Sequence, residues 1–197
     1  MITNPRCLYN DSFASFLNKD INSIFGALCD NYHGEALTTT REAWKSELII
    51  MRNVITRLND TKGKIIFEYD IPRLGKRIDA VLLYRGIVFC IEFKVGESKI
   101  LESNIDQVLD YALDLKNFHK FSQDKLIVPI LVATRYSATT TDIQMSVYDD
   151  RVVNPLVTNK NRNFDTKLRF FFYAQKALNR GISQKKKSSV VILCAFI

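Results

Sequence analysis

The sequence RIDAVLLYRGIVFCIEFKV, from Arg77 to Val95, decides how this chain folds. Apolar residues dominate both halves, and the pair Arg85-Gly86 separates them, which predicts two antiparallel strands joined by a two-residue turn. A leading Arg is unusual in such a turn, where Asn-Gly or Gly-Gly is favoured. A register slip of one residue would exchange the two faces of a strand. The register of this hairpin therefore determines which side chains meet.

The predicted turn specifies which residues face each other. Tyr84 pairs with Ile87, every cross-strand pair has residue numbers that sum to 171, and Asp79 faces Glu92. Directly opposed side chains point to the same side with Cβ atoms about 5 Å apart, so two carboxylates would be close enough to share one divalent cation. Lys94 follows Glu92 by two residues and shares that face.

These charged residues have two interpretations. Opposed carboxylates destabilise a hairpin, which calls for a compensating positive charge. A metal ion could provide it, and so could Lys94 in an ordinary salt-bridged strand end. The other hairpin residues are apolar: Val81, Leu83, Val88 and Cys90 are expected on the carboxylate face, and Ile78, Ala80, Leu82, Ile87, Phe89, Ile91 and Phe93 on the opposite face.

The segments around the hairpin predict an α/β domain. Apolar residues recur at helical spacing over 11–32, 41–58 and 102–121. Residues 64–71 alternate like a strand, and 126–134 form a continuous apolar run, which is typical of a strand buried on both faces. The expected order is α-α-β-β-β-α-β, with a mixed central sheet flanked by helices.

Glu47 is a carboxylate on the apolar side of the helix predicted over 41–58. The apolar stripe of that helix comprises Trp44, Leu48, Met51, Val54, Ile55 and Leu58. At 100° per residue, Glu47 falls inside this stripe. A carboxylate directed into a core must be paired, protonated or bound to a cation. Glu47 is therefore either a flank residue that reaches solvent or a ligand.

Polar residues also line one edge of the helix predicted over 102–121. Gln107, Tyr111 and Asp114 recur at i, i+4 and i+7, beside its apolar stripe. Such a line is either an ordinary polar boundary or a set of ligand contacts. His119 near the helix end either interacts with the C-terminal end of the helix or binds phosphate.

The chain length and net charge limit the domain organisation and the class of partner. The 197 residues suit one globular domain, divided here into an N-terminal helical segment over 1–40, a core over 41–136 and a basic C-terminal extension over 137–197. With 28 Lys and Arg against 21 Asp and Glu, the net charge of +7 favours a polyanionic partner, although solvated basic faces produce the same balance.

Cysteine spacing and hydropathy exclude several classes. The four cysteines form no CxxC pair and have no close His partner, which argues against zinc and iron–sulfur sites and predicts reduced thiols. No basic stretch followed by an apolar core opens the chain, and no apolar run reaches the 18 residues of a membrane span. We expect a cytoplasmic protein without a membrane partner.

The spacing of these charged and polar residues resembles the PD-(D/E)xK nuclease pattern. Asp79 is followed thirteen residues later by Glu92-Phe93-Lys94, and Gln107 with Tyr111 is similar to the QxxxY motif of RecB-type nucleases. Here RID stands where the family has PD, so the proline is missing. The resemblance implies a restriction-endonuclease-like core.

The resemblance also implies a role for each residue. In this family Asp and Glu hold magnesium, Lys positions or activates the attacking water, and a helical Glu before the first strand completes the site. The implied catalytic residues are Asp79, Glu92, Lys94 and Glu47; the implied ligands of Mg²⁺ or Mn²⁺ are Asp79, Glu92, Glu47 and the Phe93 carbonyl; the implied substrate-binding residues are Gln107 and Tyr111.

A narrower resemblance covers Trp44 to Thr134. FEYDIPRLGKRIDAVLLYRGIVFCIEFKVG, DQVLDYALDLKNFH and IVPILVAT are similar to the N-terminal nuclease-like domain of bacterial Schlafen-like DNA/RNA helicase proteins. No GxxxxGK[ST] segment is present, so no nucleotide-binding loop is expected. The chain is then a standalone nuclease, a natural truncation or a frameshifted copy, and a separate helicase or ATPase becomes an expected partner.

The resulting hypothesis is a metal-dependent nuclease that hydrolyses phosphodiester bonds, with DNA favoured over RNA. The alternative is a non-catalytic nucleic-acid-binding or regulatory module that recruits DNA or RNA to a separate motor. A third interpretation, an interaction domain without a nucleic-acid partner, predicts no salt-dependent DNA affinity.

Overall fold

The computed structural model describes residues 6–32, 37–71, 75–137, 151–160 and Leu168. Most of the basic extension expected over 137–197 lies outside these residues, including the lysine run 185–187 and the apolar C-terminal segment. Within the described residues, no helix is both long and apolar enough to cross a membrane.

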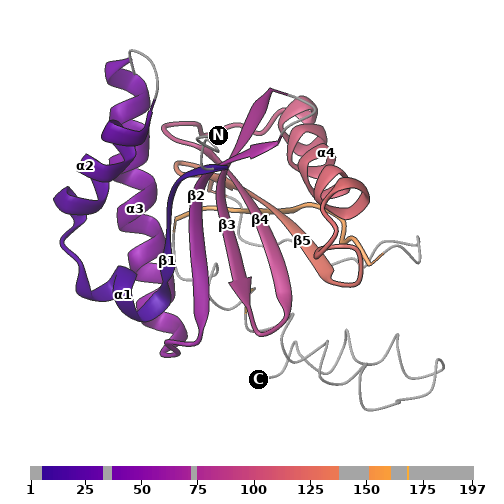
Figure 1. Ribbon diagram of the computed structural model, residues 1–197. Helices are drawn as coiled ribbons and strands as arrows, with labels where there is room; N and C mark the ends of the chain where they lie inside the picture. The colour runs from indigo at the N-terminus through magenta and orange to yellow at the C-terminus, as the bar shows by residue number, and fades with distance from the viewer. Residues whose placement is uncertain (1–5, 33–36, 72–74, 138–150, 161–167, 169–197) are drawn as a thin grey trace.

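A six-stranded sheet forms the centre, with its strands in the order β1-β2-β3-β4-β5-β6 (Figure 1). The strands are β1 (Cys7–Ser12), β2 (Gly63–Ile71), β3 (Lys76–Tyr84), β4 (Ile87–Lys94), β5 (Leu126–Ala133) and β6 (Leu156–Thr158). The first four are antiparallel neighbours, whereas β4, β5 and β6 run parallel. The expected mixed sheet is confirmed.

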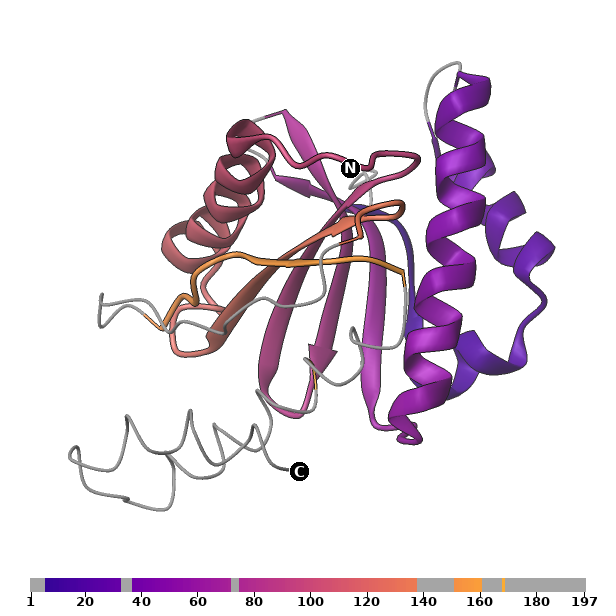
Figure 2. The same ribbon diagram turned by 180° about the vertical axis from the view of Figure 1, so that it is seen from behind.

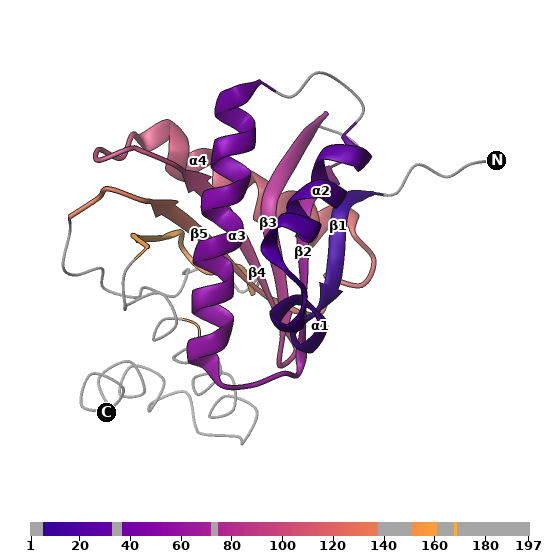
Figure 3. The same cartoon turned by 90° about the vertical axis from the view of Figure 1, so that its left-hand side faces the viewer.

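Helices cover both faces of this sheet. They are α1 (Phe13–Asn18), α2 (Ile21–Asn31), α3 (Thr38–Leu58) and α4 (Glu102–Phe118). Figures 1 and 2 show α1, α2 and α3 on one side and α4 on the other, and Figure 3 shows α3 lying along the sheet. Helix α4 makes the crossover between β4 and β5, as a parallel pair requires.

The helix expected over 11–32 is wrong in two respects. The chain first forms β1, an edge strand paired with β2, and then two helices instead of one. The Ser12 hydroxyl accepts from the Ser15 N–H and caps α1, and the Asp20 carboxylate accepts from the first N–H groups of α2. The backbone is extended at Lys19, which ends α1. The cap at Asp20 then begins α2 as a separate helix.

Two further differences concern the element order. The expected order α-α-β-β-β-α-β matches the run from α2 to β5. Strand β1 and helix α1 precede that run, and strand β6 follows it. Helix α3 starts at Thr38, three residues earlier than expected, and α4 ends at Phe118 with His119 as its extended C-cap. The restriction-endonuclease-like assignment therefore stays a prediction.

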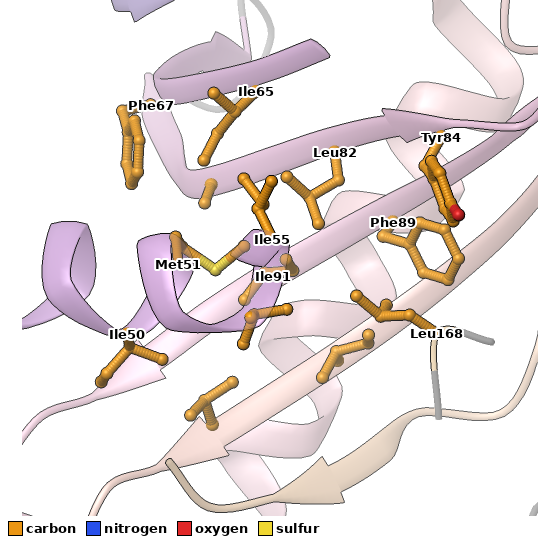
Figure 4. Packing of buried hydrophobic residues seen from close by; sticks show 14 of the residues in the cluster. Ile50, Met51, Ile55, Ile65, Phe67, Leu82, Tyr84, Phe89, Ile91 and Leu168 are labelled. Atoms are coloured by element: carbon orange, nitrogen blue, oxygen red, sulfur yellow. The ribbon is translucent and has the colours of Figure 1, made fainter. Parts of the chain in front are cut away.

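The sheet separates two cores. The α3-side core includes Phe13, Phe16, Leu28, Trp44, Leu48, Met51, Val54, Ile55, Ile65, Phe67, Ala80, Leu82, Tyr84, Phe89, Ile91, Phe93, Val128, Ile130 and Val132. The α4-side core includes Ile71, Ile78, Val81, Val88, Cys90, Tyr111, Ala112, Leu115 and Ile127. Figure 4 shows Met51 and Ile55 of α3 directed at the sheet residues Leu82 and Ile91.

The hairpin register is the predicted one. Pairs run from Tyr84↔Ile87 to Ala80↔Ile91, all with the expected sum. Arg85 and Gly86 have φ angles of 51° and 83°, the left-handed conformations of a two-residue hairpin turn. The Arg85 guanidinium donates to the Asp60 carboxylate, which lies between α3 and β2, with Nε–Oδ2 at 2.9 Å.

Candidate functional site

Strands β3 and β4 separate at the end opposite their turn. Their last pair is Ala80↔Ile91; beyond it β3 stays paired with β2 as far as Lys76, and β4 stays paired with β5 as far as Lys94. We call the space where the two strands part the fork.

The alternation of side chains reverses at the fork. In β2, Phe67 belongs to the α3-side core, whereas Tyr69, two residues later, packs against the α4-side core. In β3, Ala80 and Ile78 differ in the same way. The placement of Ile78 on the face of Ala80, expected from regular alternation, is therefore wrong, because the ladder between β2 and β3 is irregular between these residues.

Glu68 and Asp79 lie at the point of reversal. Each sits between the pairs Phe67↔Ala80 and Tyr69↔Ile78, and neither belongs to a ladder pair itself. Glu68 has a φ of 54°, which is rare for a residue other than glycine and marks local backbone strain.

Four carboxylates from four elements influence one another electrostatically around the fork. Glu47 comes from α3, Glu68 from β2, Asp79 from β3 and Glu92 from β4, and each interacts electrostatically with at least one of the others. We call these four residues the carboxylate cluster. The sequence placed three of them together; Glu68 was missed.

Asp79 does not pair with Glu92 across a ladder as expected. Its Oδ2 accepts from the Phe93 N–H at 2.7 Å, so the carboxylate occupies the position that a strand partner would have. Its pKa is raised well above the usual range, first by burial and then by the charges of Glu92 and Glu47. Asp79 keeps a partly exposed surface at the fork although protein atoms surround it.

Glu92 is held from the α4 side. Its Oε1 accepts from Lys94 Nζ at 2.9 Å and from Gln107 Nε2 at 3.0 Å, while its buried Oε2 has no partner among the described residues. Burial raises the pKa of Glu92, and the Lys94 charge lowers it less than burial raises it. One oxygen of this carboxylate thus accepts from two side chains, and the other is buried beside the Asp79 carboxyl group.

Gln107 and Tyr111 contact the cluster itself. Gln107 Oε1 accepts from Lys94 Nζ at 3.0 Å, and Gln107 Nε2 donates to Tyr111 Oη at 2.7 Å as well as to Glu92. Tyr111 is only 2% exposed. In this structure the two side chains position Glu92 and Lys94; their expected contact with substrate stays a prediction.

Glu47 is enclosed on the α3 side of the cluster. It is 4% exposed, as its place in the apolar stripe predicted, and its Oε2 has no partner among the described residues. Burial, followed by the charges of Glu68 and Glu92, raises its pKa to about 8. Of the two interpretations of Glu47, the flank residue that reaches solvent is wrong.

Glu68 bridges the cluster to the α3 side. Its Oε1 accepts from Trp44 Nε1 at 2.9 Å, and Arg77 lies 3.9 Å from Oε2. Burial raises its pKa. A sequence signal existed, because Glu68 stands eleven residues before Asp79 in a strand predicted to pair with the hairpin, but regular alternation gave no reason to place it beside Asp79.

The donor set suits a hard divalent cation, which takes carboxylate oxygens as ligands. The two buried oxygens without a partner, on Glu47 and Glu92, are the kind of group that such an ion satisfies. Among the described residues, however, no group of three or more His, Cys, Asp or Glu side chains already closes on one ion. Burial raises the pKa of all four carboxyl groups, which favours their protonated forms when no cation is bound.

Comparison with known proteins adds no name to this site: no family model, no curated protein and no solved structure matches the chain. What the fold and site define is an α/β protein with a buried carboxylate cluster at a strand fork.

Proposed function

We propose that this protein is a metal-dependent nuclease, in which Asp79, Glu92 and Glu47 hold Mg²⁺ or Mn²⁺ and phosphodiester bonds of DNA or RNA are hydrolysed. The observation that carries this proposal is the meeting of four carboxylates at the fork with two buried oxygens unpartnered. Burying like charges without partners costs several kcal/mol, so such an arrangement calls for a cation or for retained protons.

Lys94 supports hydrolysis rather than cation binding alone. Its side chain is 24% exposed, so the amine reaches the surface of the site while Glu92 and Gln107 hold it in place. A cation bound here would polarise the phosphate and make a bound water more acidic. The Lys94 amine is placed to donate a hydrogen bond to the attacking water or to a phosphate oxygen that gains charge.

The remaining implied roles belong to the same proposal. The Phe93 carbonyl would be a further ligand, supported by the closeness of the Phe93 main chain to Asp79. Gln107 and Tyr111 would hold the substrate backbone on the α4 side. The net charge of +7 supports a nucleic-acid partner, and unwinding would come from a separate helicase or ATPase.

One observation favours the alternative, a non-catalytic nucleic-acid-binding module. Lys94 already neutralises Glu92, and the four carboxylates can retain protons, so the cluster is self-sufficient without a cation. Such a module would bind nucleic acid without cleaving it.

The test is cleavage of end-labelled single- and double-stranded DNA and RNA with Mg²⁺ or Mn²⁺. We expect cleavage by the wild type and none by the double variant Asp79→Ala, Glu92→Ala. The matched control is Glu102→Ala, Asp106→Ala, which removes two exposed carboxylates from α4 and should cleave normally. Circular dichroism and thermal unfolding establish that all three are folded.

Two results would contradict the proposal. Equal cleavage by the wild type and the Asp79, Glu92 double variant would show that the activity comes from elsewhere. Absence of cleavage by the folded wild type on all four substrates, with salt-dependent binding retained, would establish the non-catalytic module instead.

A further inference from the structure

A cavity of about 350 Å³ lies on the α4 side of the sheet, close to the fork. Its walls are Arg6, Tyr69, Ile71, Asp114, Leu115, Phe118 and His119. Ligand pockets of about 300–1,000 Å³ with apolar walls and a few polar groups are typical of small-molecule sites. This cavity has that composition, and the residues of the carboxylate cluster do not line it.

Aromatic rings form part of its walls. The Tyr69 and His119 rings are nearly perpendicular at 87°, with centroids 6.4 Å apart, and Phe121 lies against His119 with centroids at 5.9 Å. Phe121 is 77% exposed. An exposed aromatic ring beside a cavity provides a flat surface on which a planar ligand can stack.

Asp114 is the polar group that sets the chemistry of the cavity. Its Oδ2 is buried and has no hydrogen-bond partner among the described residues. Burial and the charge of Arg6 lower the pKa of His119, and His119 Nδ1 lies 2.7 Å from Ser122 Oγ. The walls therefore combine a carboxylate oxygen without a partner among the described residues, the Arg6 guanidinium and aromatic rings.

Two elements connect this cavity to the carboxylate cluster. Asp114 lies two turns beyond Gln107 on the same edge of α4, about 10 Å along the helix axis. Tyr69 directly follows Glu68 in β2. A few nucleotides of one strand span such a distance.

We propose that this cavity binds an unpaired nucleobase of the strand whose phosphate lies at the carboxylate cluster, so that the substrate is single-stranded at this point. The inference rests on the proposed nuclease function and specifies its substrate class. A base held in a duplex is stacked and paired, and its edge is not free to meet Asp114.

The acceptor also selects among bases. An ionised carboxylate only accepts hydrogen bonds. Guanine presents two adjacent donors, N1–H and the N2 amino group, whereas thymine has one N–H flanked by two carbonyl oxygens. We therefore expect single strands containing guanine to bind more tightly than oligo(dT).

The experiment is fluorescence anisotropy with the full chain in EDTA, where binding is measured without metal-dependent cleavage. Labelled single-stranded DNA containing guanine is compared with oligo(dT) and with a duplex of the same sequence. The test variant is Asp114→Asn, and the control is Asp110→Asn, an exposed carboxylate on the same helix. Thermal unfolding checks that both variants fold.

The charge change makes this comparison decisive. Removing a negative charge should strengthen binding to a polyanion at either position. We expect Asp114→Asn instead to weaken the binding of guanine-containing single strands about tenfold or more, because a hydrogen bond to a charged group is lost. Phe121→Ala, at a 77% exposed position, should weaken the binding of these strands about fivefold or more through lost stacking.

Three results would overturn the inference. They are equal binding by the two asparagine variants, duplex binding as tight as single-strand binding, and displacement by guanosine monophosphate at the affinity of the strand, which would make this a free-nucleotide site. Cleavage by the wild type with any of them would refute the base site alone. Loss of binding in Asp114→Asn without any wild-type cleavage would refute the nuclease alone.

Discussion

The two ends of the β3–β4 hairpin differ in nearly every property. At the turn end the ladder is continuous, and buried apolar side chains such as Leu82 and Phe89 lie in the α3-side core. At the fork the ladder stops, and the same strands present Asp79 and Glu92, carboxyl groups whose pKa values burial raises.

The two ends of one hairpin therefore contribute differently: the turn end stabilises the fold, and the fork carries the ionisable groups of the candidate site. Burial of apolar surface at the turn end stabilises the fold. Burial of carboxylates at the fork opposes folding whenever they are ionised. Substitutions at the two ends should therefore act in opposite directions on stability, and only those at the fork should act on cleavage.

The largest expected effect is at the turn end. Phe89→Ala should lower the free energy of unfolding by about 3–5 kcal/mol, because the wholly buried ring leaves a cavity. Urea unfolding measures this, and Leu83→Ala, at a 39% exposed position of the same hairpin, is the control with a smaller loss. If Phe89→Ala lowered the free energy of unfolding no more than Leu83→Ala does, the stabilising role of the buried turn end would be contradicted.

Glu47→Gln should act in the opposite direction. The folded pKa of Glu47 is about 8 against an unfolded value of 4.5, so the folded protein binds more protons between these values and its stability falls as pH rises from about 4.5 to 8. At pH 8 the variant should be more stable than the wild type by about 2–4 kcal/mol, at about 1.4 kcal/mol for each pKa unit and less some relaxation of the site.

Thermal unfolding as a function of pH measures this effect. Glu42→Gln, at an exposed position of α3, is the matched control and should follow the wild-type curve. Mg²⁺ should raise the wild-type melting temperature most at the higher pH, because ligands must lose their protons to bind it. Identical pH profiles for Glu47→Gln and the wild type would refute the linkage.

Lys94→Ala tests the fork through activity rather than stability. We expect cleavage to fall at least about a hundredfold, equivalent to about 2.7 kcal/mol of transition-state stabilisation, while Mn²⁺ binding by titration calorimetry persists. Lys99→Ala removes an exposed lysine just after β4 and should cleave normally. Cleavage retained by the Lys94 variant would refute its catalytic role.

The smallest effect concerns the turn itself. Gly86→Ala should cost about 1 kcal/mol, because φ is 83° while no atom lies within 4 Å of the added Cβ. Gly26→Ala in α2 should instead stabilise by a similar amount, since helix interiors favour alanine and space is open there too. Differential scanning calorimetry compares both, and equal signs would contradict the conformational explanation.

Local pattern predicted much of this molecule. The two-residue turn at Arg85-Gly86 and its register follow from chain connectivity, and the burial of Glu47 follows from helical periodicity. The meeting of Glu47 with Asp79 and Glu92 was predicted through resemblance, and their electrostatic coupling is present in the structure. Their role with a metal ion and a substrate stays a prediction.

Other features were not predictable from pattern. Strand β1 forms because an edge of β2 is available for Cys7–Ser12, a property of the folded sheet rather than of that segment. The reversal at Glu68 breaks the regular alternation on which any strand prediction depends, which is why Ile78 was assigned to the wrong face and Glu68 was left out of the site.

The sequence by itself determined the hairpin, its register and the helical face that carries Glu47, since each depends on neighbours within one element or one turn. Only the tertiary structure decided that the pairing of β3 with β4 ends at Ala80↔Ile91, because each strand there has another partner in the sheet. That separation brings four carboxylates together from four elements. Long-range pairing, not local periodicity, therefore makes the site.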